Sequence, residues 1–354
     1  MKLAWYFSRI VLWSVLSVLL LVVAIDFVFA VIGQIKSIHA GYTWGNAMLY
    51  VLLRMPSDIY LVFPIVGFLG ALIGLSILAA KSELIAMRAA GLSLAGMARA
   101  MMLTGGGLLI FYYLLSLYVA PYSRHAAIFE QSNNGDSSQN VLILSSNTWL
   151  KSGEHFLRIG EVLPQGVMNN VTDFLVQNDV LTQVRQIDQI KLISDRDWSL
   201  THVVVTTIGQ NGIVQTTSPG FTEPSLISRN LLPVIAMQPD EMSIGTLYSY
   251  IHFRKINNLS IKAYQLQFWN RLIQPLMLPI MMLLAIPFML GQVRSHSPVR
   301  LIMGLFLGFV FYIVSQFFSS LTLLSPLPPF FGAAVPVILF GLLTIILFKL
   351  MNRR

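Results

Sequence analysis

Six long apolar runs constrain this chain more than any other feature. Five of them contain no charged residue, and the first contains only Asp26. An α-helix needs roughly 20 apolar residues to cross a hydrocarbon core about 30 Å thick. The sequence therefore predicts six transmembrane helices, at about residues 10–33, 59–80, 100–120, 272–290, 301–324 and 331–348.

The first run could instead belong to a signal peptide, because Lys2 and Arg9 precede it. It is too long for the apolar part of a signal peptide, and no small-residue cleavage site follows it. We therefore expect an uncleaved first span.

Composition excludes several other classes of protein. Charged residues make up only 11% of the 354 residues, against about 25% in soluble proteins. The net charge of +8 could suggest nucleic-acid binding, but the basic residues are dispersed at helix ends and are not clustered with aromatic residues. We therefore expect no nucleic-acid partner. The absence of cysteine excludes disulfide bonds and thiolate metal sites.

The basic residues beside the spans predict the orientation, because short cytoplasmic segments are enriched in Lys and Arg. With the N-terminus inside, ten such residues face the cytoplasm against one acid, Glu83. Both termini are then cytoplasmic. The ten are Lys2, Arg9, Lys81, Arg88, Arg99, Arg294, Arg300, Lys349, Arg353 and Arg354.

A polar insertion divides the spans into two groups of three, which gives predicted domains at 1–120, 121–262 and 263–354. Short apolar groups in the insertion alternate with Asn/Gly turn signals, which predicts eight to ten strands in an antiparallel sandwich or roll. Its interior could be filled, or open to apolar chains. Residues 240–257 predict a helix with Ser243 as its N-cap. The clearest predicted strands are Val141–Leu144, Phe156–Ile159, Val171–Val176, Val180–Ile193 and Leu200–Ile208.

The segment 80–91, between the second and third spans, predicts a short cytoplasmic helix. Ser82 is the expected N-cap, Glu83 favours the positive end of the helix, and Gly91 can end it in a left-handed conformation. Spacings of three and four place Leu84, Met87 and Arg88 on one face. Such a helix could transmit force from a cytoplasmic partner, or it could only close the loop.

The sequence contains no phosphate-binding loop, no metal-binding histidine pair and no nucleophile motif. We therefore expect a transport subunit that is not an enzyme and holds neither metal nor cofactor. Asp26 is expected to be the only acid within a span. An intramembrane acid is a functional candidate by default, which leaves a proton-coupled transporter as an alternative.

Several motifs, taken together, resemble the LptF/LptG family of lipopolysaccharide-export permeases from Gram-negative inner membranes. The resemblance covers essentially the whole chain, and its last motifs are closer to the LptG branch than to the LptF branch. The motifs are Phe63-Pro64 with 69–75, 81–91, Tyr264-Gln265-Leu266, Trp269, Gln274-Pro275-Leu276, 308–312, 321–323, Pro328-Pro329 and 332–336.

This resemblance implies the fold and the partners. The fold would be six spans with a periplasmic β-jellyroll between the third and fourth. The partners would be the paralogous LptF, two copies of the ATPase LptB, LptC, the periplasmic bridge protein LptA and lipopolysaccharide. ATP and Mg²⁺ would bind only to LptB.

The resemblance also implies roles for individual residues. The cytoplasmic helix would couple to LptB through Glu83, Leu84, Met87, Arg88 and Gly91. Lipid phosphates would meet basic residues at the outer rim of a cavity, for which the candidates are Lys36, His39, Arg124 and Arg271. Each could instead be a cation that only extends to the membrane interface. Mechanical transmission to a periplasmic partner, without passage of lipid, remains a further alternative.

Overall fold

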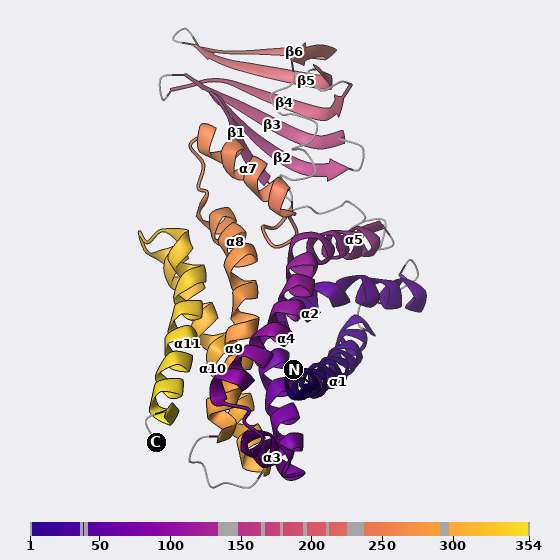
Figure 1. Cartoon of the computed structure of the whole chain (residues 1–354). Helices are drawn as coiled ribbons and strands as arrows, with labels where there is room; N and C mark the ends of the chain where they lie inside the picture. The colour runs from indigo at the N-terminus through magenta and orange to yellow at the C-terminus, as the bar shows by residue number, and fades with distance from the viewer. Residues whose placement is uncertain are drawn as a thin grey trace. The chain divides into compact units, whose positions relative to one another are not determined.

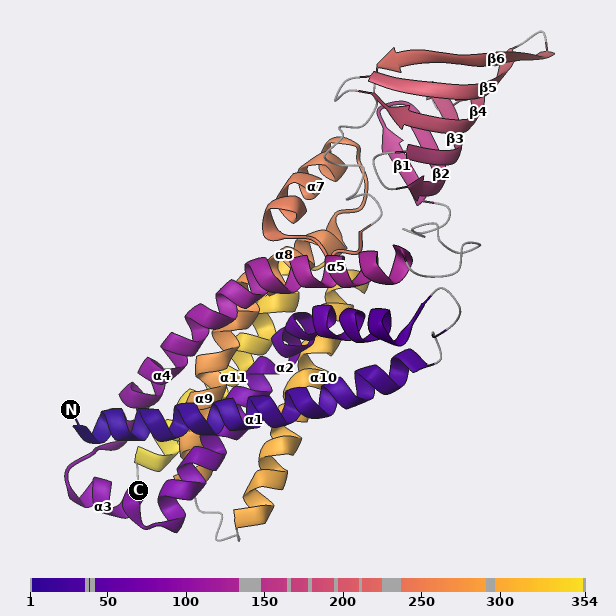
Figure 2. The same ribbon diagram turned by 90° about the vertical axis from the view of Figure 1, so that its right-hand side faces the viewer.

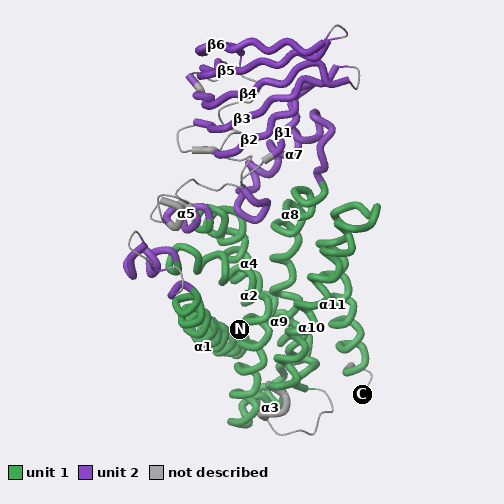
Figure 3. The backbone as a smooth tube through the Cα atoms, turned by 180° about the vertical axis from the view of Figure 1, so that it is seen from behind, with its two compact units in different colours: residues 1–33, 51–124, 262–354 green, residues 34–50, 125–261 purple. Residues whose placement is uncertain are grey.

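The computed structural model describes residues 2–35, 38, 42–133, 148–163, 167–177, 180–193, 197–209, 212–224, 237–290 and 297–352. The chain forms two compact units, coloured separately in Figure 3. Unit 1 comprises residues 1–33, 51–124 and 262–354, and unit 2 comprises 34–50 and 125–261. Each unit is described by itself below.

Helices build unit 1, and six of the described helical segments are long and apolar enough to cross a membrane. Each overlaps one of the predicted apolar runs, so the prediction of six spans is confirmed. The segments are Lys2–Gln34, Trp44–Ala80, Leu94–Ile128, Lys262–Leu290, Ile302–Leu324 and Pro329–Met351.

These spans comprise most of the labelled helices in Figure 1. The second begins at Trp44, well before its predicted start, and so includes Asp58. Because the 37 residues of α2 exceed the roughly 20 that cross a bilayer, the prediction that Asp26 is the only acid within a span stays a prediction. The helices are α1 (Lys2–Gln34), α2 (Trp44–Ala80), α3 (Glu83–Ala89), α4 (Leu94–Leu114), α5 (Ala120–Asn133), α8 (Lys262–Ile273), α9 (Met277–Leu290), α10 (Ser297–Leu324) and α11 (Pro329–Asn352).

Two spans contain a local change of helix type. A π-helical turn at Leu115–Val119 joins α4 to α5, and a 3₁₀ turn at Gln274–Leu276 joins α8 to α9. Pro275 lies in the 3₁₀ turn. Because proline lacks a backbone N–H and its ring crowds the preceding turn, it favours such an interruption at this point.

Helices α1 and α2 approach closely through small residues. A Cβ added to Gly70 would lie 2.4 Å from Val15 Cα, and one added to Gly74 would lie 3.1 Å from Val11 Cα. Small residues permit such backbone contact, which drives helix association in membranes. The sequence -Gly70-x-x-x-Gly74- therefore holds the first span against the second.

Unit 2 contains a six-stranded antiparallel sheet in which the strands pair in chain order. The inserted all-β fold is confirmed, but the described strands number six and form a meander without Greek-key crossovers. The predicted strand at Val141–Leu144 lies outside the described residues. The strands are β1 (Thr148–Ser152), β2 (His155–Leu163), β3 (Val167–Gln177), β4 (Val180–Leu192), β5 (Asp197–Gly209) and β6 (Gly212–Pro224).

Helix α7 (Ile244–Ile256) also belongs to unit 2. The Ser243 hydroxyl accepts a hydrogen bond from the Thr246 N–H, so the predicted N-cap is confirmed. At the other end Asn258 has φ +55°, and the N–H groups of Asn258 and Leu259 donate to the carbonyls of Lys255 and Arg254. This left-handed cap ends the helix.

A row of irregular positions crosses the sheet. Asn170 and His202 have positive φ values of 52° and 51°, and both are absent from the regular pairing registers of β3 and β5. Each lets two positions that are three residues apart face inward, as Met168 and Val171 do. The pairing register is the same on both sides of each position, so the row interrupts the alternation of side chains without inserting a residue into a strand. Figure 2 shows the strands of this sheet.

Candidate functional site

The cytoplasmic helix α3 begins differently from the prediction. Ser82 has φ 58° and its side chain makes no capping hydrogen bond. Ser82 therefore occupies the predicted N-cap position, but it does not cap the helix with its side chain. The Ser82 carbonyl still accepts the first helical hydrogen bond, from the Ala86 N–H. A tight turn after α2 thus sets the start of α3.

The C-terminus of α3 follows the prediction. Gly91 has φ +95°, its N–H donates to the Arg88 carbonyl, and the Leu92 N–H donates to the Met87 carbonyl. This pair of bonds is the left-handed helix cap that glycine favours. Ser93 then caps α4 by accepting a hydrogen bond from the Gly96 N–H. Both ends of the loop are therefore fixed by local sequence.

Burial divides the predicted coupling residues into two groups. Leu84 and Met87 are each only 4% exposed, because they pack into the core of unit 1. Arg88 is exposed, and Ile85 is 71% exposed. Leu84 and Met87 therefore anchor α3, whereas Ile85 and Arg88 are exposed, and the coupling role of these residues stays a prediction.

Glu83 lies in α3 and also contacts the first span. The Tyr6 hydroxyl donates a hydrogen bond of 3.0 Å to Glu83 Oε2, at an exposed position. Since an exposed hydrogen bond contributes little net free energy, this bond can exchange for a bond to a partner.

Two of the four predicted phosphate-binding residues, Lys36 and His39, lie outside the described residues. Arg124 is half-buried in α5 and lies within electrostatic range of Asp58. Asp58 also pairs with Arg54 at 2.9 Å and lies near Asp26. Arg124 therefore belongs to a group of two acidic and two basic residues within unit 1.

Arg271 is buried, being 3% exposed, and its role in phosphate binding stays a prediction. Its Nη1 donates a hydrogen bond of 2.7 Å to the Ser116 carbonyl, and the Ser116 hydroxyl donates to the Arg271 carbonyl at 3.4 Å. Ser116 lies in the π-helical turn. A π-helical turn alters the regular carbonyl pairing of the span, and the Arg271 guanidinium supplies a donor there.

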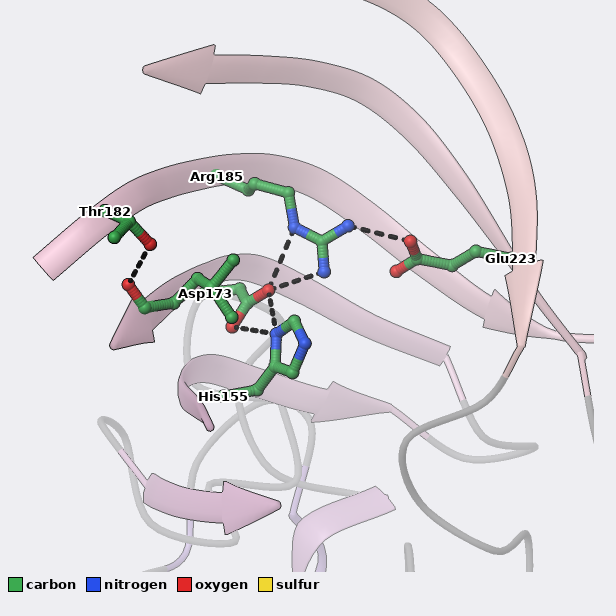
Figure 4. A network of polar contacts seen from close by, with 6 residues as sticks. His155, Asp173, Thr182, Arg185 and Glu223 are labelled. Carbon is green, nitrogen blue, oxygen red and sulfur yellow. Dashed lines mark hydrogen bonds and ion pairs between the residues drawn. The ribbon is translucent and has the colours of Figure 1, made fainter. Parts of the chain in front are cut away.

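The inner face of the sheet carries a polar cluster that the sequence interpretation missed. Asp173 is fully buried and bonds to His155 at 2.9 Å and to Arg185 at 2.6 Å, and Arg185 bonds to Glu223 at 2.7 Å. Figure 4 shows these four side chains converging from β2, β3, β4 and β6. The one signal in the sequence was an acid, Asp173, within the apolar run Val171–Val176.

Hydrogen bonds to the neighbouring acids favour the charged form of Arg185. Burial lowers the pKa of the Arg185 guanidinium, but hydrogen bonds to Glu223 and Asp173 outweigh that effect and raise the pKa overall. A buried charge is tolerated when it is paired and hydrogen-bonded. Among the described residues no group of His, Asp or Glu is arranged to hold a metal ion.

Comparison with known proteins gives one consistent answer. The family model for the lipopolysaccharide export system permease LptF/LptG matches residues 5–350. The lipopolysaccharide export system permease protein LptG of Escherichia coli is 30% identical over 96% of both chains. The protein of the same name from Haemophilus influenzae is 28% identical over 95% of this chain and 94% of its own.

These similarities confirm the predicted resemblance, including its preference for the LptG branch. Together with the six candidate spans, they confirm the predicted location in the inner membrane. The chain therefore belongs to the LptF/LptG family of lipopolysaccharide export system permeases.

Proposed function

We propose that this chain is the LptG-type permease subunit of an ATP-driven lipopolysaccharide exporter. It would take the lipid from the outer leaflet of the inner membrane and pass it through the periplasmic sheet towards LptA. Family membership supports the permease role. The ATPase, the paired permease LptF and LptC belong to the proposal.

The exposed face of α3 is the observation that supports coupling to an ATPase. This helix of seven residues lies between two spans and is anchored by Leu84 and Met87. Its outward residues, Ile85 and Arg88, combine an apolar contact with a cation. Because the anchors belong to the core of unit 1, force applied to α3 would reach the spans directly.

Energy must come from a partner in this proposal. Extracting acyl chains from a bilayer costs about 0.8 kcal/mol per CH₂ unless another apolar surface receives them. ATP and Mg²⁺ would bind two LptB subunits, whose closure would move α3 and narrow a cavity between the two permeases. Lipid would then move onto the inner face of the sheet, where Leu157, Ile187 and Val203 are buried apolar positions.

The coupling role is tested with the variants Glu83→Ala and Ile85→Asp in the complete complex. We expect each to lower the amount of LptB that copurifies by about tenfold, as the loss of a central interface residue does. ATP-dependent release of lipopolysaccharide to LptA should fall in parallel. Copurification and release are measured on the same membranes.

Tyr6→Phe is the matched control, because it removes the hydrogen bond to Glu83 but leaves the Glu83 carboxylate in place. LptB association should then stay within about twofold of the unaltered complex, the change that a solvent-exposed hydrogen bond allows. If Glu83→Ala leaves both association and release unchanged, α3 is not the coupling element.

The export proposal and the mechanical alternative differ in whether lipid passes through the chain. Photocrosslinking groups in the first span, the fifth span and the inner face of the sheet should each give lipopolysaccharide adducts. Adducts that depend on ATP at the sheet support export. Their absence from all three positions, in a complex that still hydrolyses ATP, would support mechanical transmission.

A further inference from the structure

A cavity of about 690 Å³ lies between α1 and α4 within unit 1. Its lining residues on α1 include Trp5, Arg9 and Leu12, and those on α4 include Leu103 and Gly107. The volume falls within the roughly 300–1,000 Å³ of cavities that hold small organic ligands. Figure 2 shows the two helices that line it, α1 and α4.

The polar side chains of the cavity are already satisfied. The Ser8 hydroxyl and the Thr104 hydroxyl both donate to the Ala100 carbonyl, at 3.2 and 3.0 Å. The other lining residues are apolar apart from Arg9. A ligand with several hydrogen-bonding groups would lose its bonds to water without replacement, so the cavity favours a hydrocarbon chain.

Among the described residues that line the cavity, Arg9 is the one that is charged. Its guanidinium lies 5.7 Å from the centre of the Trp5 ring and is exposed. A guanidinium binds phosphate through a planar set of donors, and no acid among the lining residues competes for it. The rim therefore favours an anionic head group.

The cavity lies at the cytoplasmic end of the first span. Its residues on α1 run from Ala4 to Leu12, about 12 Å along a helix axis, and so extend from the cytoplasmic flank into the first turn of the span predicted at 10–33. The predicted orientation puts Arg9 at the cytoplasmic interface, where anionic lipids attract basic residues.

We infer that this cavity binds one acyl chain of an anionic phospholipid from the cytoplasmic leaflet, with Arg9 contacting the phosphate. The lipid would be a bound component of the permease and would be distinct from the exported lipid. The inference does not depend on the proposed export function.

Two neighbouring glycines provide a matched test. A Cβ added to Gly107 or to Gly106 would meet no atom within 4 Å, but only Gly107 lines the cavity. Leucine also favours a helix more than glycine does, so both Gly107→Leu and Gly106→Leu should fold. The full chain is purified with phosphatidylglycerol or phosphatidylcholine of identical acyl chains, and retained lipid is counted by native mass spectrometry.

We expect the unaltered chain and Gly106→Leu to retain one phosphatidylglycerol, and Gly107→Leu to lose it. Arg9→Gln should reduce the preference for phosphatidylglycerol over phosphatidylcholine by about fivefold, equivalent to about 1 kcal/mol per basic residue. Leu103→Trp, which enlarges a 76% exposed lining residue, gives a second way of filling the cavity.

Three results would overturn the inference. Equal retention by Gly107→Leu and Gly106→Leu would place the lipid elsewhere. An unchanged head-group preference in Arg9→Gln would remove the anionic contact. If Gly107→Leu instead prevents a second subunit from copurifying while the isolated chain keeps its lipid, the cavity receives a protein helix.

Discussion

At the scale of single residues, the polar cluster of the sheet shows how a buried charge becomes part of the fold. Asp173 is fully buried, with His155 on β2 and Arg185 on β4 as its partners. The cross-strand registers place Asp173 directly opposite Leu157 and Arg185. Pairing these strands therefore brings the charges together, whereas a shift of one residue would separate them.

Removing the central cation should destabilise unit 2. We expect Arg185→Met to lower its free energy of unfolding by about 3–5 kcal/mol, because the buried Asp173 would keep only His155 as a partner and the partly buried Glu223 would lose its bond to Arg185. Denaturant titration followed by tryptophan fluorescence measures the change. The triple variant Asp173→Leu, Arg185→Met, Glu223→Leu should recover most of the loss, because it leaves no unpaired charge. Equal loss in both variants would show that packing, and not pairing, matters.

At the scale of elements, sequence periodicity predicted the existence of helices and strands better than their irregularities. Apolar length alone identifies the six spans, because a bilayer tolerates few other sequences. The positive φ values of Asn170 and His202 were not predicted, because both residues also occupy ordinary strand positions and their conformation depends on neighbouring strands. Ser82 lacks the predicted side-chain cap for a similar reason: the turn after α2 gives it a left-handed backbone, with φ 58°.

Gly220 in β6 is constrained both by its backbone conformation and by a close contact with the neighbouring strand. Its φ is +148°, and an added Cβ would lie 2.4 Å from the Leu200 carbonyl oxygen. Gly212 has φ +124° and meets no atom within 4 Å. We expect Gly220→Ala to destabilise the sheet by about 1–3 kcal/mol more than Gly212→Ala, because both variants strain the backbone but only one also forces β5 and β6 apart. Denaturant midpoints of the two variants test this, and equal midpoints would contradict it.

At the scale of the whole molecule, unit 1 is assembled from segments that flank the inserted sheet. The Tyr60 hydroxyl donates to Gln274 Oε1 at 2.7 Å, and the Tyr113 hydroxyl donates to the Leu272 carbonyl at 2.7 Å. These bonds join residues more than 150 positions apart in sequence. Hydropathy predicts the spans but not these partners, since polar pairing within a membrane depends on helix packing. Arg271 was therefore predicted as a rim cation although it belongs to this buried set.

The substitution Arg271→Lys separates the structural role of Arg271 from the predicted role in phosphate binding. Lysine keeps the positive charge but loses the planar donors of the guanidinium. If Arg271 joins the two parts of unit 1 through the Ser116 carbonyl, the variant should lose roughly 1.5–3 kcal/mol of stability, the contribution of a buried hydrogen bond from a charged group. Titration of the full chain with sodium dodecyl sulfate in mixed micelles measures that loss. Arg54→Lys is the control, because its pair with Asp58 is partly exposed and the change should stay within about 0.5 kcal/mol. A stable Arg271→Lys protein that still releases lipopolysaccharide, beside an inactive but stable Arg271→Leu protein, would instead support a phosphate contact.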